Sequence, residues 1–145
     1  MNNYVGQLVK AYLHVLDGSI TYNGQPVNVY NVSVSAAENF HHILLRPESE
    51  SDSSNKRSFV TNPVVIADII TVHEGGIDAS VVEYIDDQMR DLIFTTRNTT
   101  ALTEVAGMQI LNVKAENSSY LDGFNGTRHE YRKITRFTNR ILQTT

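Results

Sequence analysis

The sequence predicts an α+β fold: an antiparallel or mixed β-sheet of about five strands, two α-helices packed on one face, and long inter-strand loops. Residues 3–17 and 78–94 repeat apolar side chains at helical spacing. Elsewhere, runs rich in β-branched residues are separated by turn signals, which is typical of strands. Because most of these runs follow one another along the chain, they are expected to pair sequentially into one sheet.

The first predicted helix covers residues 3–17. Asn2 or Asn3 can cap its first turn, and Asp17-Gly18 ends it. Its apolar stripe contains Val5, Leu8, Val9, Tyr12, Leu13 and Leu16. This stripe is therefore expected to face the sheet.

A small hairpin is predicted next. Ile20 to Tyr22 and Val27 to Val32 show short apolar alternation on either side of Asn23-Gly24. The Asn-Gly dipeptide is typical of two-residue hairpin turns, in which both positions need positive φ. We therefore expect these two segments to pair with each other.

Two longer strands follow, at His41 to Arg46 and Ser58 to His73. Residues 47–57 between them are polar and charged, which predicts a long solvated loop. Residues 64–72 are almost continuously apolar and mostly β-branched, as in strands that are buried on both faces. This segment is expected to form the middle of the sheet.

The second predicted helix covers residues 78–94. Gly75-Gly76 breaks the preceding strand, and the Asp78 side chain can cap the helix. Its apolar stripe contains Val81, Val82, Ile85, Met89, Leu92 and Ile93, opposite the charged residues Glu83, Asp86, Asp87, Arg90 and Asp91. The apolar stripe is expected to lie on the sheet.

A closing antiparallel pair is predicted after a connection rich in Thr and Asn. Met108 to Lys114 and Thr127 to Ile141 have strand character, whereas residues 117–126 are rich in Asn, Ser and Gly. We therefore expect a second long loop at 117–126. The last strand leaves the second face of the sheet only half apolar, so a neighbouring subunit is a natural cover for it.

Bulk properties predict one domain over residues 1–145, a common domain size. The composition, 41% hydrophobic and 19% charged, is near globular averages and disfavours global disorder. The absence of cysteine excludes disulfides, thiolate catalysis and cysteine-based zinc sites. No basic segment precedes an apolar run, and no stretch approaches the ~20 apolar residues of a membrane span, so we expect cytoplasmic synthesis and no membrane contact.

The predicted last strand places Arg128, Arg132 and Arg136 on one face. The formal net charge of −4 disfavours an overall polyanion binder, but charge is unevenly distributed. The arginines form either a basic ribbon that meets an acidic neighbour or passing DNA, or a solvated edge strand protected by charge. Candidate acidic partners, within one chain or between chains, are Glu83 and Asp87 on the helix and Glu48, Glu50 and Asp52 in the first loop.

Catalytic machinery is not apparent. His41-His42 and His73-Glu74 resemble metal ligands, but adjacent strand residues point to opposite faces, so we expect structural or surface roles for them. Asp68, inside the apolar strand, is the best candidate for a perturbed acid and is expected to pair with an arginine. We therefore predict a protein that is not an enzyme, with no catalytic residue, cofactor or metal.

The layout of nearly the whole chain resembles the tail terminator or tail completion proteins of tailed bacteriophages. The resemblance rests on the opening helix, the segment Gly24 to Tyr30, the strand Val65 to Val72 that leads through Glu74-Gly75-Gly76 into helix 78–94, and the Asp-Gly turn and Arg-His strand within residues 122–132. His41 to Leu45 replaces the early aromatic strand that many relatives carry after a proline.

The resemblance implies a structural virion protein at the head-tail junction. Such proteins form a ring, usually a hexamer, that caps the tail tube and joins it to the neck. Implied partners are further copies of the chain, the tail-tube protein, neck, portal or head-completion proteins, and genomic DNA passing through the lumen. An acidic helix facing a basic strand would give complementary subunit surfaces, and the loops 46–58 and 117–127 would fold onto tube or neck partners.

Two alternatives stay open. The first is another ring of a tailed phage, such as a dodecameric neck, collar or head-completion protein. The second is a cytosolic enzyme or ligand-binding domain, in which Asp68, a histidine and an arginine would line one pocket. Ring size and bound partner separate the first alternative from a terminator.

Overall fold

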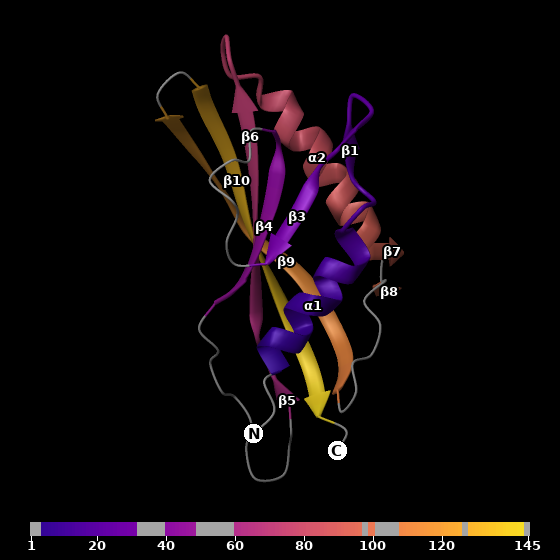
Figure 1. Ribbon diagram of the computed structural model, residues 1–145. Coiled ribbons are helices and arrows are strands. Elements are labelled where there is room, and N and C mark those ends of the chain that lie inside the picture. The colour runs from indigo at the N-terminus through magenta and orange to yellow at the C-terminus, as the bar shows by residue number, and fades with distance from the viewer. Residues whose placement is uncertain are drawn as a thin grey trace.

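The computed structural model describes residues 4–31, 40–48, 60–96, 99–100, 108–125 and 128–143. Two helices and a twisted sheet make up most of this part of the chain (Figure 1). The elements are, in order, α1 (Tyr4–Leu16), β1 (Thr21–Tyr22), β2 (Gln25–Pro26), β3 (Asn28–Asn31), β4 (His42–Pro47), β5 (Val60–Thr61), β6 (Val64–His73), α2 (Ala79–Ile93), β7 (Phe94–Thr96), β8 (Thr99–Thr100), β9 (Met108–Asn125) and β10 (Arg128–Gln143).

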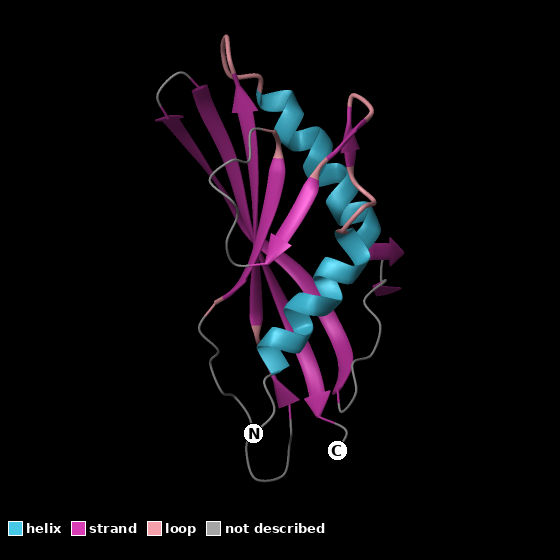
Figure 2. Cartoon of the chain, viewed as in Figure 1, coloured by secondary structure: helices cyan, strands magenta, loops and turns pink. Residues whose placement is uncertain are grey.

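The main sheet has the order β3-β4-β6-β10, with β9 on the far side of β10. The β3–β4 pair is parallel and the other pairs are antiparallel, so the sheet is mixed. The short strand β5 pairs with the end of β10 and lies in line with β6, from which Asn62 and Pro63 separate it. Both helices cover the same face (Figure 2), which confirms the predicted fold class.

The central position of β6 is confirmed. Nine of its ten residues are buried, and β4 and β10 flank it. Its β-branched side chains suit a pleated surface packed on both sides. Val65, Ala67 and Ile69 point into the core under the helices, while Ile66, Asp68 and Ile70 alternate to the other face.

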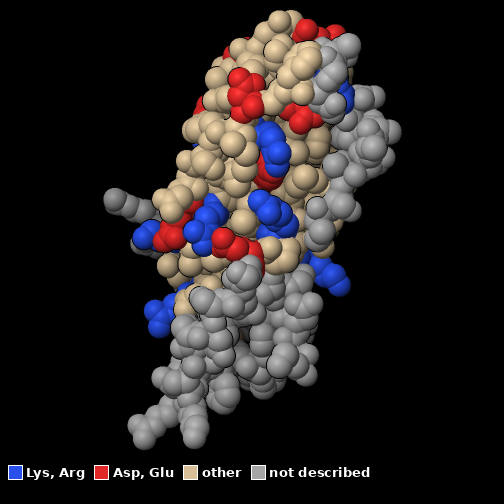
Figure 3. All heavy atoms as spheres, turned by 90° about the vertical axis from the view of Figure 1, so that its left-hand side faces the viewer, with Lys and Arg blue, Asp and Glu red and all other residues tan. Residues whose placement is uncertain are grey.

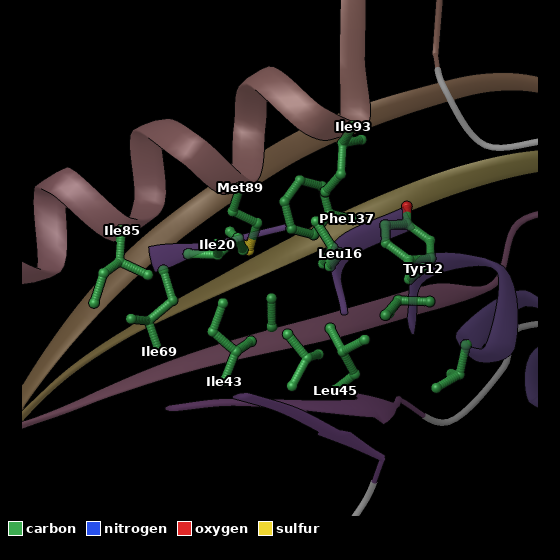
Figure 4. Packing of buried hydrophobic residues seen from close by; sticks show 14 of the residues in the cluster. Tyr12, Leu16, Ile20, Ile43, Leu45, Ile69, Ile85, Met89, Ile93 and Phe137 are labelled. Atoms are coloured by element: carbon green, nitrogen blue, oxygen red, sulfur yellow. The ribbon is translucent and has the colours of Figure 1, made fainter. Parts of the chain in front are cut away.

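Both predicted helices are confirmed within a residue or two at each end. Asp78 caps α2 as expected, because its Oδ1 accepts hydrogen bonds from the Ser80 N–H at 3.0 Å and the Ser80 hydroxyl at 2.7 Å. The apolar stripes of both helices meet the sheet in one buried cluster (Figure 4). Its largest fully buried members are Tyr12, Phe137, Leu8, Leu16, Ile20, Ile43, Leu45, Ile69, Ile85, Met89 and Ile93.

A buried polar link ties α1 to the sheet. The Tyr12 hydroxyl donates a hydrogen bond to Asn139 Oδ1, and burial raises the pKa of Tyr12 above its usual value. The Asn139 backbone N–H and side-chain amide both donate to the Pro63 carbonyl, at 3.0 and 3.3 Å. Asn139 therefore satisfies polar groups at the break between β5 and β6.

The predicted hairpin at residues 20–32 is only partly correct. Asn23 and Gly24 form the turn, with φ of 51° and 78°, and β1 pairs with β2 across it. Val27 still bonds across the hairpin, because its N–H donates to the Ile20 carbonyl at 2.9 Å, but the described residues after it leave the hairpin. Val32 lies outside the described residues. Residues 28–31 form β3, which pairs in parallel with β4 at the edge of the main sheet.

The predicted loop at 117–126 is wrong over the residues that the structure describes there. β9 continues to Asn125 and stays paired with β10. Ser118 lies opposite Thr135 and Glu116 opposite Arg136, so Asn117 is an extra residue, with φ of 46°. A β-bulge thus absorbs a sequence that looks like a turn.

Two predicted connections remain to be compared with the structure. The Thr- and Asn-rich segment after α2 contains β7 and β8, a short antiparallel pair that was not predicted. The expected loop at 47–57 lies largely outside the described residues, except that Pro47 ends β4 and Glu48 follows it.

The core predicts a strong dependence of stability on Phe137. This side chain is fully buried between Tyr12 and Phe94, with ring centroids at 5.7 and 6.3 Å. Phe137→Ala is expected to lower the free energy of unfolding by about 3–5 kcal/mol, measured by urea denaturation. Gln25→Ala, at an exposed position of β2, is the control, with a change below about 0.5 kcal/mol. A loss below about 1 kcal/mol in Phe137→Ala would contradict this packing.

Candidate functional site

The face of the sheet opposite the helices is called the open face here. Both helices lie on the other side, so the described helices leave this face uncovered (Figures 1 and 2). The register of β4, β6 and β10 places Leu44, Ile66, Asp68, Ile70, Arg132, Ile134 and Arg136 on it. Charged and apolar side chains are therefore mixed on one extended surface.

Asp68 is the most deeply buried charged group on the open face, with 1% of its surface exposed. The Arg132 guanidinium binds it with two nitrogens: Nε donates to Oδ1 at 3.2 Å, and Nη2 donates to Oδ2. This hydrogen bonding raises the pKa of Arg132. The prediction that Asp68 pairs with an arginine is confirmed.

Arg136 is paired as well, at a more exposed position. Its Nη2 donates to Glu48 Oε2, and the two side chains are 40% and 33% exposed. Arg128 lies on the same face, because it is four residues before Arg132 in β10 and side chains alternate along a strand. Because Arg132 and Arg136 have carboxylate partners within the chain, the open face is not a continuous basic ribbon, and Figure 3 shows acidic groups among the basic ones.

The other predicted acidic residues lie elsewhere. Glu83 is on the helix side of the sheet, where it accepts hydrogen bonds from Lys133 Nζ at 2.9 Å and the Tyr120 hydroxyl at 2.6 Å. Asp87 is exposed on α2. Glu50 and Asp52 lie outside the described residues. Within one chain, then, the structure brings Glu48 to an arginine but not Glu83, and contacts between chains stay a prediction.

Lys133 forms a buried charge cluster that the sequence analysis did not identify. Its Nζ donates to Asp86 Oδ2 at 2.8 Å as well as to Glu83, and Asp86 also accepts from Arg90 Nε at 2.9 Å. Burial alone would lower the pKa of Lys133, but the hydrogen bonds that it donates to the two carboxylates outweigh burial and raise this pKa. The sequence did contain a signal for this cluster: Lys133 occupies a buried position of β10, and Glu83 and Asp86 lie three residues apart on α2.

The end of the β9–β10 hairpin exposes large apolar side chains. Tyr120, Leu121 and Phe124 are 46%, 50% and 64% exposed, and together they are called the hairpin tip. The Tyr120 ring stacks on Tyr131 with centroids 5.8 Å apart, and its hydroxyl bonds Glu83. Sequence analysis missed this surface because its residues were assigned to a loop.

The histidines are held by hydrogen bonds at the same end of the sheet. His41 Nδ1 accepts the Val72 N–H at 3.0 Å, and His73 Nε2 bonds the Thr71 hydroxyl at 2.8 Å. The two rings lie 5.9 Å apart, and both residues are buried. Burial, with smaller effects of His73 and His42, lowers the pKa of His41 to about 4. These contacts agree with a structural role.

The structure brings together some of the residues that the ligand-binding alternative requires. Asp68 and Arg132 do come together, and His42 lies on the same face, opposite Ile70 in the neighbouring strand. However, both Asp68 oxygens accept from the guanidinium. Among the described residues, no group of three or more histidine and acidic side chains is arranged to hold a metal ion. In the same part of the chain, no helix has the length and apolar character that crossing a bilayer requires.

Comparison with known proteins identifies a likeness in structure. No protein-family model matches the sequence, and no curated protein matches it. Among solved structures, the chain is similar to one in the "Virion of native gene transfer agent (GTA) particle", with a TM-score of 0.58 and 12% sequence identity. The match covers 94% of this chain and 91% of that chain. At this identity the likeness shows a shared fold along nearly the full length of both chains.

We expect substitutions in the two arginine pairs of the open face to lower the free energy of unfolding by different amounts. Arg132→Leu leaves Asp68 charged, buried and unpaired, so it is expected to lower the free energy of unfolding by about 3 kcal/mol. Arg136→Leu is the matched control: Glu48 can be hydrated there, so the expected loss is below about 1 kcal/mol. Urea denaturation at pH 7 measures both. Equal losses would contradict the difference in burial.

His41 predicts a specific loss of stability in acid. Because its pKa is lower in the folded protein than the ordinary 6.5, folding favours the neutral ring. This contribution is complete above pH 6.5 and is lost as pH falls toward 4. Relative to His41→Gln, which cannot titrate, the wild type should lose up to about 3 kcal/mol across this range. Parallel pH profiles of the two proteins would show that His41 is not the group responsible.

Proposed function

We propose that this protein is a structural component of a phage-like virion. It forms a ring at the head-tail junction, caps the tail tube and joins it to the neck or portal. The observation that carries the proposal is the fold shared with a chain of a gene transfer agent virion, over 94% of this chain and 91% of that one. The order of elements that resembles tail terminators agrees with it and supports the more specific role.

The arrangement of polar groups supports a structural role over catalysis. The charged side chains with the lowest exposure, Asp68, Asp86 and Lys133, are held in ion pairs that join neighbouring elements. Groups tied up in this way stabilise the relative positions of strands and helix. We accordingly propose a single domain that needs no cofactor and assembles in the host cytoplasm before it becomes part of the virion.

The open face is the proposed contact surface for other virion proteins. It combines half-buried apolar side chains such as Leu44 and Ile134 with the paired residues Arg132 and Arg136. Half-apolar faces of this kind are common at protein interfaces, and arginine is enriched there. The exposed acidic side of α2, including Asp87, is a second surface available to a neighbour or to the tail-tube and neck proteins.

Contact with passing DNA is the alternative role that we propose for the open face, in place of contact with other virion proteins. If the open face lines the lumen, Arg128, Arg132 and Arg136 would face the phosphates. Asp68 and Glu48 partly neutralise two of these arginines, which reduces their attraction for a polyanion. Weak, salt-sensitive contacts suit a surface along which DNA must slide.

The oligomeric state tests this proposal. Light scattering across a concentration series, with negative-stain imaging, is expected to show closed rings of six copies, formed by the protein alone or after tail-tube protein is added. Rings of twelve would favour a neck, collar or head-completion protein. A protein that stays monomeric at all concentrations, with and without tail-tube protein, would contradict the ring.

A further inference from the structure

The hairpin tip combines exposed apolar side chains with an unpaired strand edge. Among the described residues, β9 pairs with β10 alone, so its outer edge offers free backbone N–H and C=O groups. Exposed edge strands are usually protected by charge, proline or short length. The stretch 117–125 is nine residues long and contains one charged residue, Asp122, and no proline. This edge has the properties of a surface that another molecule covers.

The end of the sheet that carries the hairpin tip is acidic, and is called the apical end. Register places His73 opposite His129, and His129 opposite Phe124, at this end. Its acidic residues are Asp122 in β9, Glu130 in β10, and Glu74 and Asp78 between β6 and α2, with Arg128 as a nearby cation. Glu74, Asp78 and Asp122 are exposed.

Among the described residues, the opposite, basal end is basic. Register places Lys114 opposite Thr138, and Arg136 and Arg46 on either side of Ile66. Arg140 follows two residues after Thr138, and Arg46, Lys114 and Arg140 are all exposed. Glu48 and Glu116 also lie here and offset part of the positive charge. Glu48 accepts a hydrogen bond from Arg136, and Glu116 accepts one from Thr138 and lies 3.7 Å from Lys114 Nζ. In the view of Figure 3, acidic groups are visible near the top, and basic groups mixed with acidic ones lie in the middle.

We propose that copies of this chain bind one another head to tail, with the hairpin tip of one copy docked on the basal end of the next. A second copy is the partner because the acidic and basic ends are complementary in charge, which favours this orientation over two like ends. Such a contact joins two different surfaces, and an interface of this kind forms a ring when the rotation between successive copies closes, or a filament when it does not. The inference rests on the proposed ring and names the surfaces that would build it.

The contact would also bury the apolar groups of the tip. Leu121 and Phe124 are the most exposed side chains of the hairpin tip, and covering them contributes the hydrophobic part of the binding free energy. At the basal end, Pro47 is exposed and Leu142 is half-buried, so apolar groups are present to receive them. Charge sets the orientation, and apolar burial holds the complex.

A charge-swap experiment tests the proposal. Variant A carries Glu74→Lys and Asp122→Lys at the apical end, and variant B carries Lys114→Glu and Arg140→Glu at the basal end. Each variant alone brings like charges together, so its dissociation constant for self-association, measured by sedimentation velocity, should rise at least about tenfold. Mixed in equal amounts, A and B regain opposite charges at both kinds of contact, and association should return.

A second set of variants separates docking from folding. Leu121→Ser with Phe124→Ser should weaken association without lowering the thermal midpoint of unfolding. His14→Ser, at an exposed residue of α1 that belongs to neither proposed surface, is the control and should associate like the wild type. If wild-type rings form but variants A and B assemble normally, or their mixture is not restored, this inference is overturned and the proposed function stands. A wild type that never associates overturns both.

Discussion

The antiparallel pairing of β6 with β10 is the constraint on which the rest of the structure depends. It runs over ten residue pairs, from His73 opposite His129 to Val64 opposite Thr138. Because side chains alternate, this register puts Phe137 under the helices and Arg132 on the open face. A slip of one residue would exchange the two sets and bury arginines in the core. Ion pairs join β10 to its neighbours on both faces: Arg132 pairs with Asp68 of β6 on one face, and Lys133 pairs with Asp86 of α2 on the other.

In this arrangement, buried ion pairs hold the elements of one chain together, and other surfaces remain free to bind a second protein. The most buried charges join strands to strands and α2 to β10, so they serve cohesion. The open face and the hairpin tip, in contrast, present apolar side chains that the described helices do not cover. A small protein with such surfaces gains free energy by binding other proteins. The fold shared with a virion chain agrees with that physical expectation.

Sequence predicted the elements whose pattern is local. Both helices and β6 follow from apolar spacing, and the pairing of Asp68 follows from the cost of burying a lone charge. The strand at 117–125 could not be predicted, because its Asn, Ser and Gly residues are turn-like and only hydrogen bonds to β10 hold it extended. The parallel pairing of β3 and the ion pair of Lys133 with Asp86 depend on contacts between distant segments. Short periodicities carry no information about such contacts.

The central claim is that surfaces left open in the single chain are covered in an assembly. Amide hydrogen exchange, followed by mass spectrometry in dilute protein and in assembled rings, tests it most directly. In the dilute protein, we expect fast exchange at the alternate amides of residues 118–125 that point to the outer edge of β9, which no other described strand pairs with. These amides should be strongly protected on assembly. Residues 64–73 of β6 should be protected in both states. Equal exchange of 118–125 in the two states, or protection already complete in the monomer, would contradict the account.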